Sequence, residues 1–204
     1  MKSTKALFPA MGLLLLSVAF GGEVQHWVGQ DSSALRVHGK SSLIPWILRA
    51  TRLEVGFDLL GPEATKARSL EQVAACRIAN LLVQVPVEGL KSTEGPGMDK
   101  NTWAALKSKQ SPLVTFAVES ADFAPVPGRE GLRRALLTGT VRIAGKEKAL
   151  SIPVEAEIQD QKLLLRGQVE ITMTDFGILP PVISKINVAD KVVVDFSVSF
   201  APGN

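Results

Sequence analysis

Near its C-terminal end the chain alternates strictly between apolar and polar residues, and this feature constrains the fold more than any other. In residues 162–173 the apolar face carries Leu163, Leu165, Gly167, Val169, Ile171 and Met173. In residues 192–200 it carries Val192, Val194, Phe196, Val198 and Phe200, opposite Asp195, Ser197 and Ser199. A period of two is typical of β-strands with one buried face. Two such strands predict an apolar interior.

The stretch between these strands, residues 174–181, cannot extend either of them. Pro180 and Pro181 lack amide donors, and Gly177 favours a turn. We expect a connector that fixes the last strand. Its apolar residues, Phe176, Ile178 and Leu179, offer an alternative role as a gate to the interior.

The N-terminus has the pattern of a signal peptide. Lys2 and Lys5 precede a mostly apolar run over residues 6–20, and small residues follow near Gly21. The run is too short to span a bilayer comfortably. We therefore expect a signal peptide over residues 1–21, a mature domain over 22–204 without a stable transmembrane anchor, and a periplasmic or secreted protein.

Composition argues against several classes of function. The formal net charge is only +3, and the charged residues are scattered, so no nucleic acid partner is expected. The single cysteine, Cys76, excludes an internal disulfide and is expected to be a small buried hydrophobe. His26 and His38 are the only histidines and lack the spacing of metal ligands, so neither a metal nor a prosthetic group is expected.

Further alternating segments recur along the chain. They cover residues 34–37, 46–59, 78–87, 113–121, 134–143 and 151–158. With the two C-terminal segments they make about eight strands. Most connections are short, which favours antiparallel neighbours. Residues 98–109 predict one substantial helix with Asp99 as its N-cap, and residues 62–70 predict a polar surface connection. The sequence thus predicts a single all-β domain, an antiparallel barrel or sandwich.

Three segments resemble the YceI-like family of bacterial periplasmic proteins, some of which bind polyisoprenoids. They are residues 98–107 (MDKNTWAALK) leading into 111–116 (SPLVTF), residues 137–148 (LTGTVRIAGKEK) and residues 174–178 (TDFGI). The chain departs from the family at residues 31–33 (DSS), where many members have a histidine. The resemblance implies an eight-stranded, lipocalin-like antiparallel barrel that holds an amphiphilic lipid, such as an isoprenoid or a quinone. Some relatives dimerise, so the resemblance also offers a homodimer as an alternative to a monomer.

The inward-facing residues form a candidate lining for that lumen. They are Phe57, Val85, Trp103, Phe116, Val118, Leu137, Val141, Val154, Leu165, Val169, Ile171, Val194 and Phe196. Trp103 could cap the barrel or anchor the helix. Small residues on the apolar faces, Ala79, Gly139, Ala156 and Gly167, are expected to leave space. The alternative is an ordinary core filled by its own side chains.

These patterns favour a binding protein that performs no catalysis, because no nucleophile elbow, phosphate loop or dinucleotide motif occurs. A second hypothesis is an enzyme acting on a lipid-like substrate in the same barrel, with Asp31 and His38 as an acid and a base near the rim. A third is a solid barrel that binds a partner through its outer surface. A ligand-sized lumen would separate the first two hypotheses from the third.

Overall fold

A computed structural model describes residues 22–180, 182–183 and 186–203, so the predicted signal peptide lies outside the described residues. The strands are β1 (Glu23–Gly29), β2 (Ala34–Lys40), β3 (Pro45–Ala50), β4 (Glu54–Gly61), β5 (Arg77–Pro86), β6 (Leu90–Ser92), β7 (Leu113–Pro125), β8 (Leu132–Ile143), β9 (Lys146–Gln159), β10 (Lys162–Thr172), β11 (Val182–Ile183), β12 (Ile186–Asn187) and β13 (Lys191–Pro202). The helices are α1 (Leu70–Ala75) and α2 (Pro96–Ala105), with 3-10 turns η1 (Ala64–Lys66), η2 (Val87–Gly89) and η3 (Met173–Phe176).

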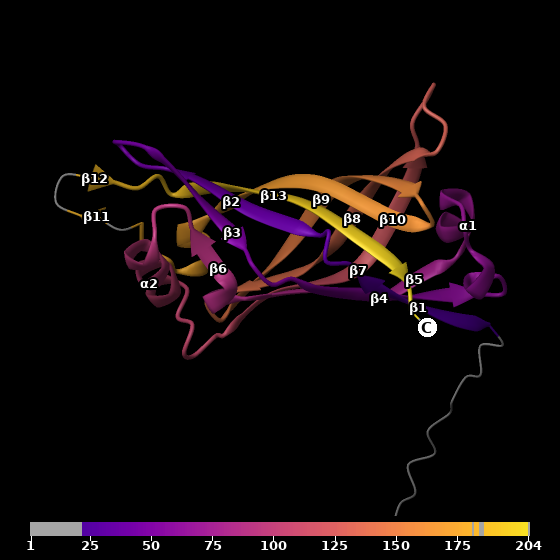
Figure 1. Ribbon diagram of the computed structural model, residues 1–204, viewed down its shortest axis with the longest axis horizontal. Coiled ribbons are helices and arrows are strands. Elements are labelled where there is room, and N and C mark those ends of the chain that lie inside the picture. Colours follow the sequence, from indigo (N-terminus) through magenta and orange to yellow (C-terminus); the bar gives the residue numbers. More distant parts are fainter. Residues whose placement is uncertain (1–21, 181, 184–185, 204) are drawn as a thin grey trace, which may run out of the picture.

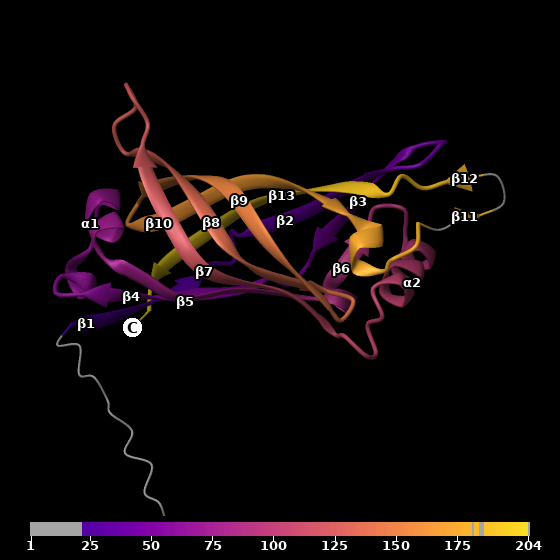
Figure 2. The same ribbon diagram turned by 180° about the vertical axis from the view of Figure 1, so that it is seen from behind.

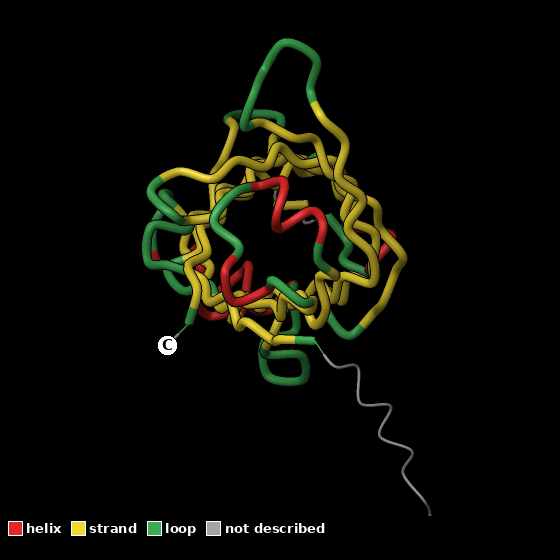
Figure 3. Tube along the Cα trace, turned by 90° about the vertical axis from the view of Figure 1, so that its right-hand side faces the viewer, coloured by secondary structure: helices red, strands yellow, loops and turns green. Residues whose placement is uncertain are grey.

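The described strands close into an antiparallel barrel. The order β1-β4-β5-β7-β8-β9-β10-β13 returns to its start because β13 also pairs with β1, which gives a closed barrel of eight strands. Figure 1 shows the barrel from the side, and Figure 3 shows the ring of strands from the end that carries α1. The predicted all-β antiparallel barrel is confirmed.

Three short strands lengthen the barrel at one end. β2 pairs with β13 next to β1, β3 pairs with β2, and β6 pairs with β3. β1 and β2 are therefore two halves of one interrupted strand, as are β3 with β4 and β5 with β6. Hydrogen bonds hold the interruptions in place, from Gln30 N to Ser199 O at 2.8 Å and from Thr51 N to Gly89 O at 2.9 Å.

Tight turns fix the register of the C-terminal strands. Ala144 and Gly145 join β8 to β9 with φ of 50° and 82°, and Asp160 and Gln161 join β9 to β10 with φ of 49° and 61°. Positive φ at both central residues defines the two-residue turns that match the twist of a hairpin. β10 then pairs with β13 from Leu163 opposite Phe200 to Thr172 opposite Lys191.

The two ends of the barrel differ. α1 lies at one end, and α2 lies at the other beside β6 and the β11–β12 hairpin (Figures 1 and 2). At the α1 end Trp27 stacks on Phe57 with ring centroids 5.6 Å apart, and Phe200 meets Phe57 edge-on at 5.1 Å. All three rings are buried, so they plug this end of the barrel.

The prediction for the segment before β5 is wrong. Residues 62–70 were predicted to be a polar surface connection, yet Ala64, Ala67 and Leu70 are buried. The helix α1 follows directly, and a capping box starts it: Ser69 Oγ accepts from Gln72 N at 3.3 Å, and Gln72 Oε1 accepts from Ser69 N at 3.0 Å. A short amphipathic turn with few apolar residues gives a weak periodic signal, which is why the sequence pattern missed it.

The start of α2 also differs from the prediction. The helix begins at Pro96 after Gly95, whose φ of 98° turns the chain. Asp99 is therefore inside the helix and does not cap it. Its buried carboxylate accepts from Ser92 N at 2.6 Å and lies 3.6 Å from Lys91 Nζ. This side chain ties α2 to β6.

Candidate functional site: an apolar lumen

The barrel is not solid, because a cavity of about 570 Å³ opens at the α2 end. Its walls come from β2, β3, β5–β8, β10, β13, α2 and the connector after η3. The lining residues are Leu35, Val37, Ser41, Ile44, Trp46, Leu48, Val85, Leu90, Glu94, Met98, Asn101, Thr102, Ala104, Ala105, Leu106, Val114, Ile143, Ile171, Met173, Ile178, Leu179, Val188, Val192 and Val194.

A second cavity of about 130 Å³ lies deeper in the barrel. The residues that line both cavities are Leu35, Val85, Val114, Ile143, Ile171 and Val194. The two spaces therefore adjoin and form one lumen along the barrel axis. Phe200 lines the deeper cavity and also belongs to the aromatic plug with Phe57 and Trp27. The lumen thus opens at the α2 end and is blocked at the α1 end.

The mouth is built from three segments. α2 contributes Met98, Thr102 and Ala105, which recur at helical spacing on one face. The β2–β3 turn contributes Ile44, and the connector after η3 contributes Leu179. Leu179 belongs to the connector considered above as a gate to the interior, whereas Ile44 lies in a turn without periodicity and was missed.

Most of the predicted lining surrounds this lumen. Val85, Phe116, Val118, Leu137, Val141, Leu165, Val169, Ile171, Val194 and Phe196 line one or both cavities. Ile143 and Val192 also line the lumen and could have been found, because each continues the apolar face of its strand. Whether these residues bind a ligand remains a prediction.

Three predicted residues lie away from the two cavities. Phe57 belongs to the aromatic plug, and Val154 is buried on β9, where it pairs with Ala135 of β8 and Gly167 of β10. Trp103 is half-buried on α2, where its Nε1 donates to Leu90 O at 3.1 Å and Lys91 Nζ lies 4.0 Å above its ring. Of the two roles considered for Trp103, these contacts match the helix anchor.

The two glycines among the predicted small residues do not open the lumen in the way expected. A Cβ on Gly139 would come within 2.1 Å of Ala117 O, so this glycine allows close approach of β7 and β8. A Cβ on Gly167 would lie 2.6 Å from Phe196 Cζ and 3.0 Å from Pro153 O. The space beside each glycine is therefore occupied by atoms of a neighbouring strand or ring, and it adds no volume to the lumen.

Polar groups are sparse in the lumen and gather at the mouth. Ser41, Asn101 and Thr102 line the larger cavity, and Glu94 is the one charged lining residue among those described. The deeper cavity has a single polar lining residue, Thr115. The lumen therefore offers dispersion contacts along its length and hydrogen bonds near its entrance.

The imidazole groups lie on the outer wall. His38 Nε2 is 2.7 Å from Asp195 Oδ1, and both residues alternate with the lumen-lining Val37 and Val194. His38 thus pairs with Asp195 rather than with Asp31, the acid proposed for it.

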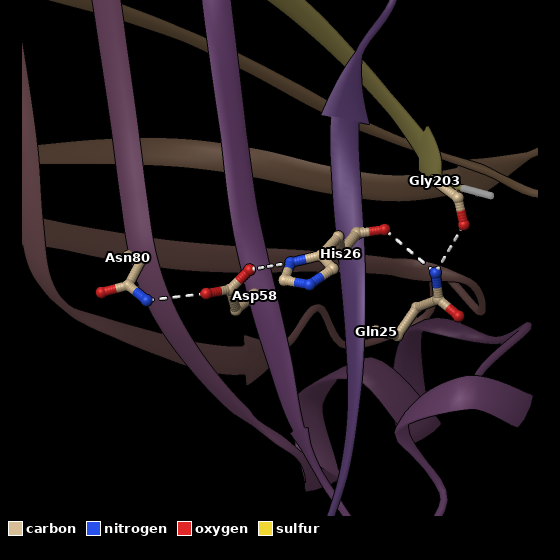
Figure 4. Close-up of polar contacts among 5 residues, drawn as sticks. All are labelled: Gln25, His26, Asp58, Asn80 and Gly203. Atoms are coloured by element: carbon tan, nitrogen blue, oxygen red, sulfur yellow. Dashed lines mark hydrogen bonds and ion pairs between the residues drawn. The ribbon is translucent and has the colours of Figure 1, made fainter.

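The second imidazole, on His26, forms another outer-wall pair. His26 Nδ1 lies 2.5 Å from Asp58 Oδ1, and Asn80 Nδ2 donates to Asp58 Oδ2 at 2.6 Å (Figure 4). Hydrogen bonding by Asn80, followed by that of His26, lowers the pKa of Asp58 below its ordinary value. Neither imidazole pair faces the lumen.

The remaining candidates for catalysis or metal binding do not add a reactive group to the lumen. Burial, together with the nearby charge of Glu63, raises the pKa of the Cys76 thiol, which disfavours the nucleophilic thiolate. Within the described residues no cluster of three or more His, Cys, Asp or Glu side chains could hold a metal ion. No described helix is long and apolar enough to cross a membrane.

Comparisons with known proteins agree with this geometry. A family model described as the YceI-like domain matches residues 52–200. Solved structures with a similar fold include BcnA of Burkholderia cenocepacia, at 17% identity and a TM-score of 0.61, with 82% of this chain and 95% of that chain covered. Another is a polyisoprenoid binding domain from Saccharophagus degradans, implicated in plant cell wall breakdown, at 11% identity and a TM-score of 0.63, with 89% of this chain and 100% of that chain covered. A search of curated proteins finds no match.

Proposed function

The chain belongs to the YceI-like family, and we propose that it is an exported carrier that holds one isoprenoid or similar amphiphilic lipid in its barrel without reacting with it. The apolar lumen is the observation that carries the proposal. Its larger cavity, about 570 Å³, has the size of a site for a small organic ligand. Each methylene transferred from water into such a space gains about 0.8 kcal/mol.

The asymmetry of the lumen supports an orientation for the lipid. The aromatic plug of Trp27, Phe57 and Phe200 blocks the α1 end, so the tail enters first and points toward this plug. The head group stays at the α2 end, where Ser41, Glu94 and Asn101 offer polar atoms. Most of the binding free energy of such a lipid comes from its tail. The polar contacts of its head group fix its position along the lumen.

The relatives and the outer wall support the other parts of the proposal. The S. degradans neighbour is described as polyisoprenoid binding, and it shares the fold. Both histidines pair with carboxylates on the outer wall, away from the lumen, which supports binding without catalysis. The leader-like pattern over residues 1–21 supports export to the periplasm or beyond.

Native mass spectrometry of the mature protein, purified from a bacterial periplasmic extract without detergent, tests this function. We expect a population carrying one lipid-sized adduct, and solvent extraction should release an isoprenoid or quinone. A fluorescent isoprenoid analogue should then occupy the emptied barrel with a stoichiometry of one. A protein that carries no lipid and takes up no analogue would contradict the proposal.

A further inference from the structure

The three most exposed large apolar side chains among the described residues lie at one end of the molecule. They are Leu179, Leu43 and Ile44, with 79%, 70% and 54% of their surface exposed. Leu43 and Ile44 form the β2–β3 turn, and Leu179 follows η3. Both segments border the mouth of the lumen. We call these three residues the apolar rim.

The apolar rim is continuous with the lumen, and hydrogen bonds fix the backbone of its β2–β3 turn. Ile44 and Leu179 line the larger cavity as well as facing solvent. In the turn, Ser41 Oγ accepts from Leu43 N at 3.3 Å and from Ile44 N at 3.1 Å, and it donates to Ile44 O at 2.8 Å. These hydrogen bonds of one hydroxyl fix the backbone of the turn that carries Leu43 and Ile44.

Several lysines on elements at the α2 end have no carboxylate partner. Lys40 ends β2 beside the turn, and Lys100, Lys107 and Lys109 lie in or just after α2; none has an ion-pair partner among the described residues. The one acid inside α2, Asp99, is buried and lies beside Lys91. The other carboxylates near this end are already engaged or single: Asp175 lies 2.9 Å from Lys148 Nζ, Asp190 accepts from Thr174 N at 2.9 Å, and Glu94 lines the mouth. Apolar side chains flanked by lysines are the combination that binds an anionic membrane surface.

We infer that the α2 end docks on an anionic phospholipid bilayer, with the apolar rim inserted among the acyl chains and the lysines near the head groups. This inference rests on the proposed function, since it explains how a water-insoluble lipid reaches the lumen. A lipid leaving the bilayer would pass along Leu179 and Ile44 directly into the cavity. Its tail would not have to cross water.

Flotation of the mature protein with vesicles of phosphatidylethanolamine and phosphatidylglycerol tests the docking. Leu43→Glu is the informative variant, because Leu43 is exposed and does not line either cavity. It should weaken vesicle binding about tenfold or more, the effect of withdrawing one leucine side chain from an apolar phase. Leu136→Glu is the matched control: Leu136 is an exposed leucine, 43% accessible, on the outer wall of β8. This control should float as the wild type does.

Uptake of the fluorescent isoprenoid analogue, measured in parallel in vesicle-free solution, separates the two proposals. Docking is supported if Leu43→Glu takes up the analogue normally but loses flotation. Docking is overturned, with the carrier function intact, if the wild type takes up the analogue yet fails to float, or if both glutamate variants float equally. Docking is also overturned if the rim instead joins two copies of the chain, seen as a wild-type dimer that Leu43→Glu dissociates without any flotation. If the wild type floats, Leu43→Glu does not, and neither takes up the analogue, the docking proposal stands and the carrier function is contradicted.

Discussion

The ring of Phe196 on β13 occupies the space above the bare backbone of Gly167 on β10, its direct partner in the sheet. A Cβ on Gly167 would approach Phe196 Cζ to 2.6 Å. Phe196 also lines the deeper cavity. The glycine therefore sets how far this ring lies toward the wall, and so how much of the lumen stays open.

Replacing Gly167 with alanine should destabilise the protein and narrow the deeper cavity. Overpacking costs about 1–3 kcal/mol, which exceeds the roughly 0.5–1 kcal/mol gained by replacing a strand glycine. Urea unfolding would measure the loss. Phe196→Leu in the Gly167→Ala background should recover part of it, because the shorter side chain leaves room for the methyl group. Purely additive effects of the two changes would show that the ring and the glycine are not coupled.

The aromatic plug should support stability but not lipid uptake. Phe57→Leu removes two aromatic pairs, with Trp27 and with Phe200. Each pair contributes about 0.5–1.5 kcal/mol beyond its buried area, so we expect a loss of about 1–3 kcal/mol in thermal or urea unfolding. Because Phe57 lines neither cavity, the affinity for an isoprenoid analogue should be unchanged. A large loss of affinity in folded protein would place Phe57 in the binding site after all.

The outer-wall carboxylate of Asp58 should contribute to the acid sensitivity of the fold. Asn80 and His26 lower its pKa from the ordinary 3.8, so folding favours the charged form. Its contribution is fully present above the unfolded pKa and is lost as pH falls through the lower folded value. Asp58→Asn should therefore cost about 0.2–1 kcal/mol near neutrality, the scale of exposed pairs, and the difference from wild type should shrink below about pH 4.

Urea unfolding at several pH values checks this, with Asp122→Asn as the control. Asp122 is an exposed aspartate on β7 that has no side-chain hydrogen bond or ion pair in the described structure. The control should show no such pH-dependent difference. A stability difference between wild type and Asp58→Asn that grows toward low pH would contradict the assigned direction.

The mouth should prefer a neutral head group to a phosphate. Glu94 is the only charged residue lining the larger cavity in the described structure. An isoprenoid alcohol should therefore bind about tenfold more tightly than its monophosphate, a difference of about 1.4 kcal/mol. Glu94→Lys should reduce or reverse this preference, and competition against a fluorescent analogue measures both ligands. Tighter binding of the phosphate to the wild type would show that the outer lysines control the head group.

The sequence allowed the barrel to be predicted because its long strands alternate cleanly. The face of β10 and the face of β13 were assigned correctly, and ten of the proposed lining residues lie on the lumen. β1 was missed, since the outward Val24 and Val28 are apolar and hide its alternation. The pairing of β2 and β3 as extensions of the barrel wall was not predicted either. It depends on contacts with β13 and β6, which lie far away in the sequence.

The mouth could not be predicted from periodicity. Ile44 and Leu179 lie in turns, and their exposure depends on how the β2–β3 turn and the connector sit above the barrel. Phe57 and Trp103 fit the apolar pattern but serve the plug and the helix anchor. A period of two identifies which residues face inward. Their depth along the barrel axis depends on the register of the strands and on the aromatic plug that closes the α1 end.

Val194 lines both cavities at their junction, so a lipid tail in the lumen would contact its side chain. The adjacent Val193 points to the opposite face of β13 and lines neither cavity. Titration of a fluorescent isoprenoid analogue into folded Val194→Trp and Val193→Trp compares the same substitution inside and outside the barrel. If a lipid tail occupies the lumen, the indole of Val194→Trp fills the junction and weakens binding about tenfold or more, equivalent to at least about 1.4 kcal/mol, while Val193→Trp binds as the wild type does. Equal affinities for the two variants would contradict a lipid tail in the lumen.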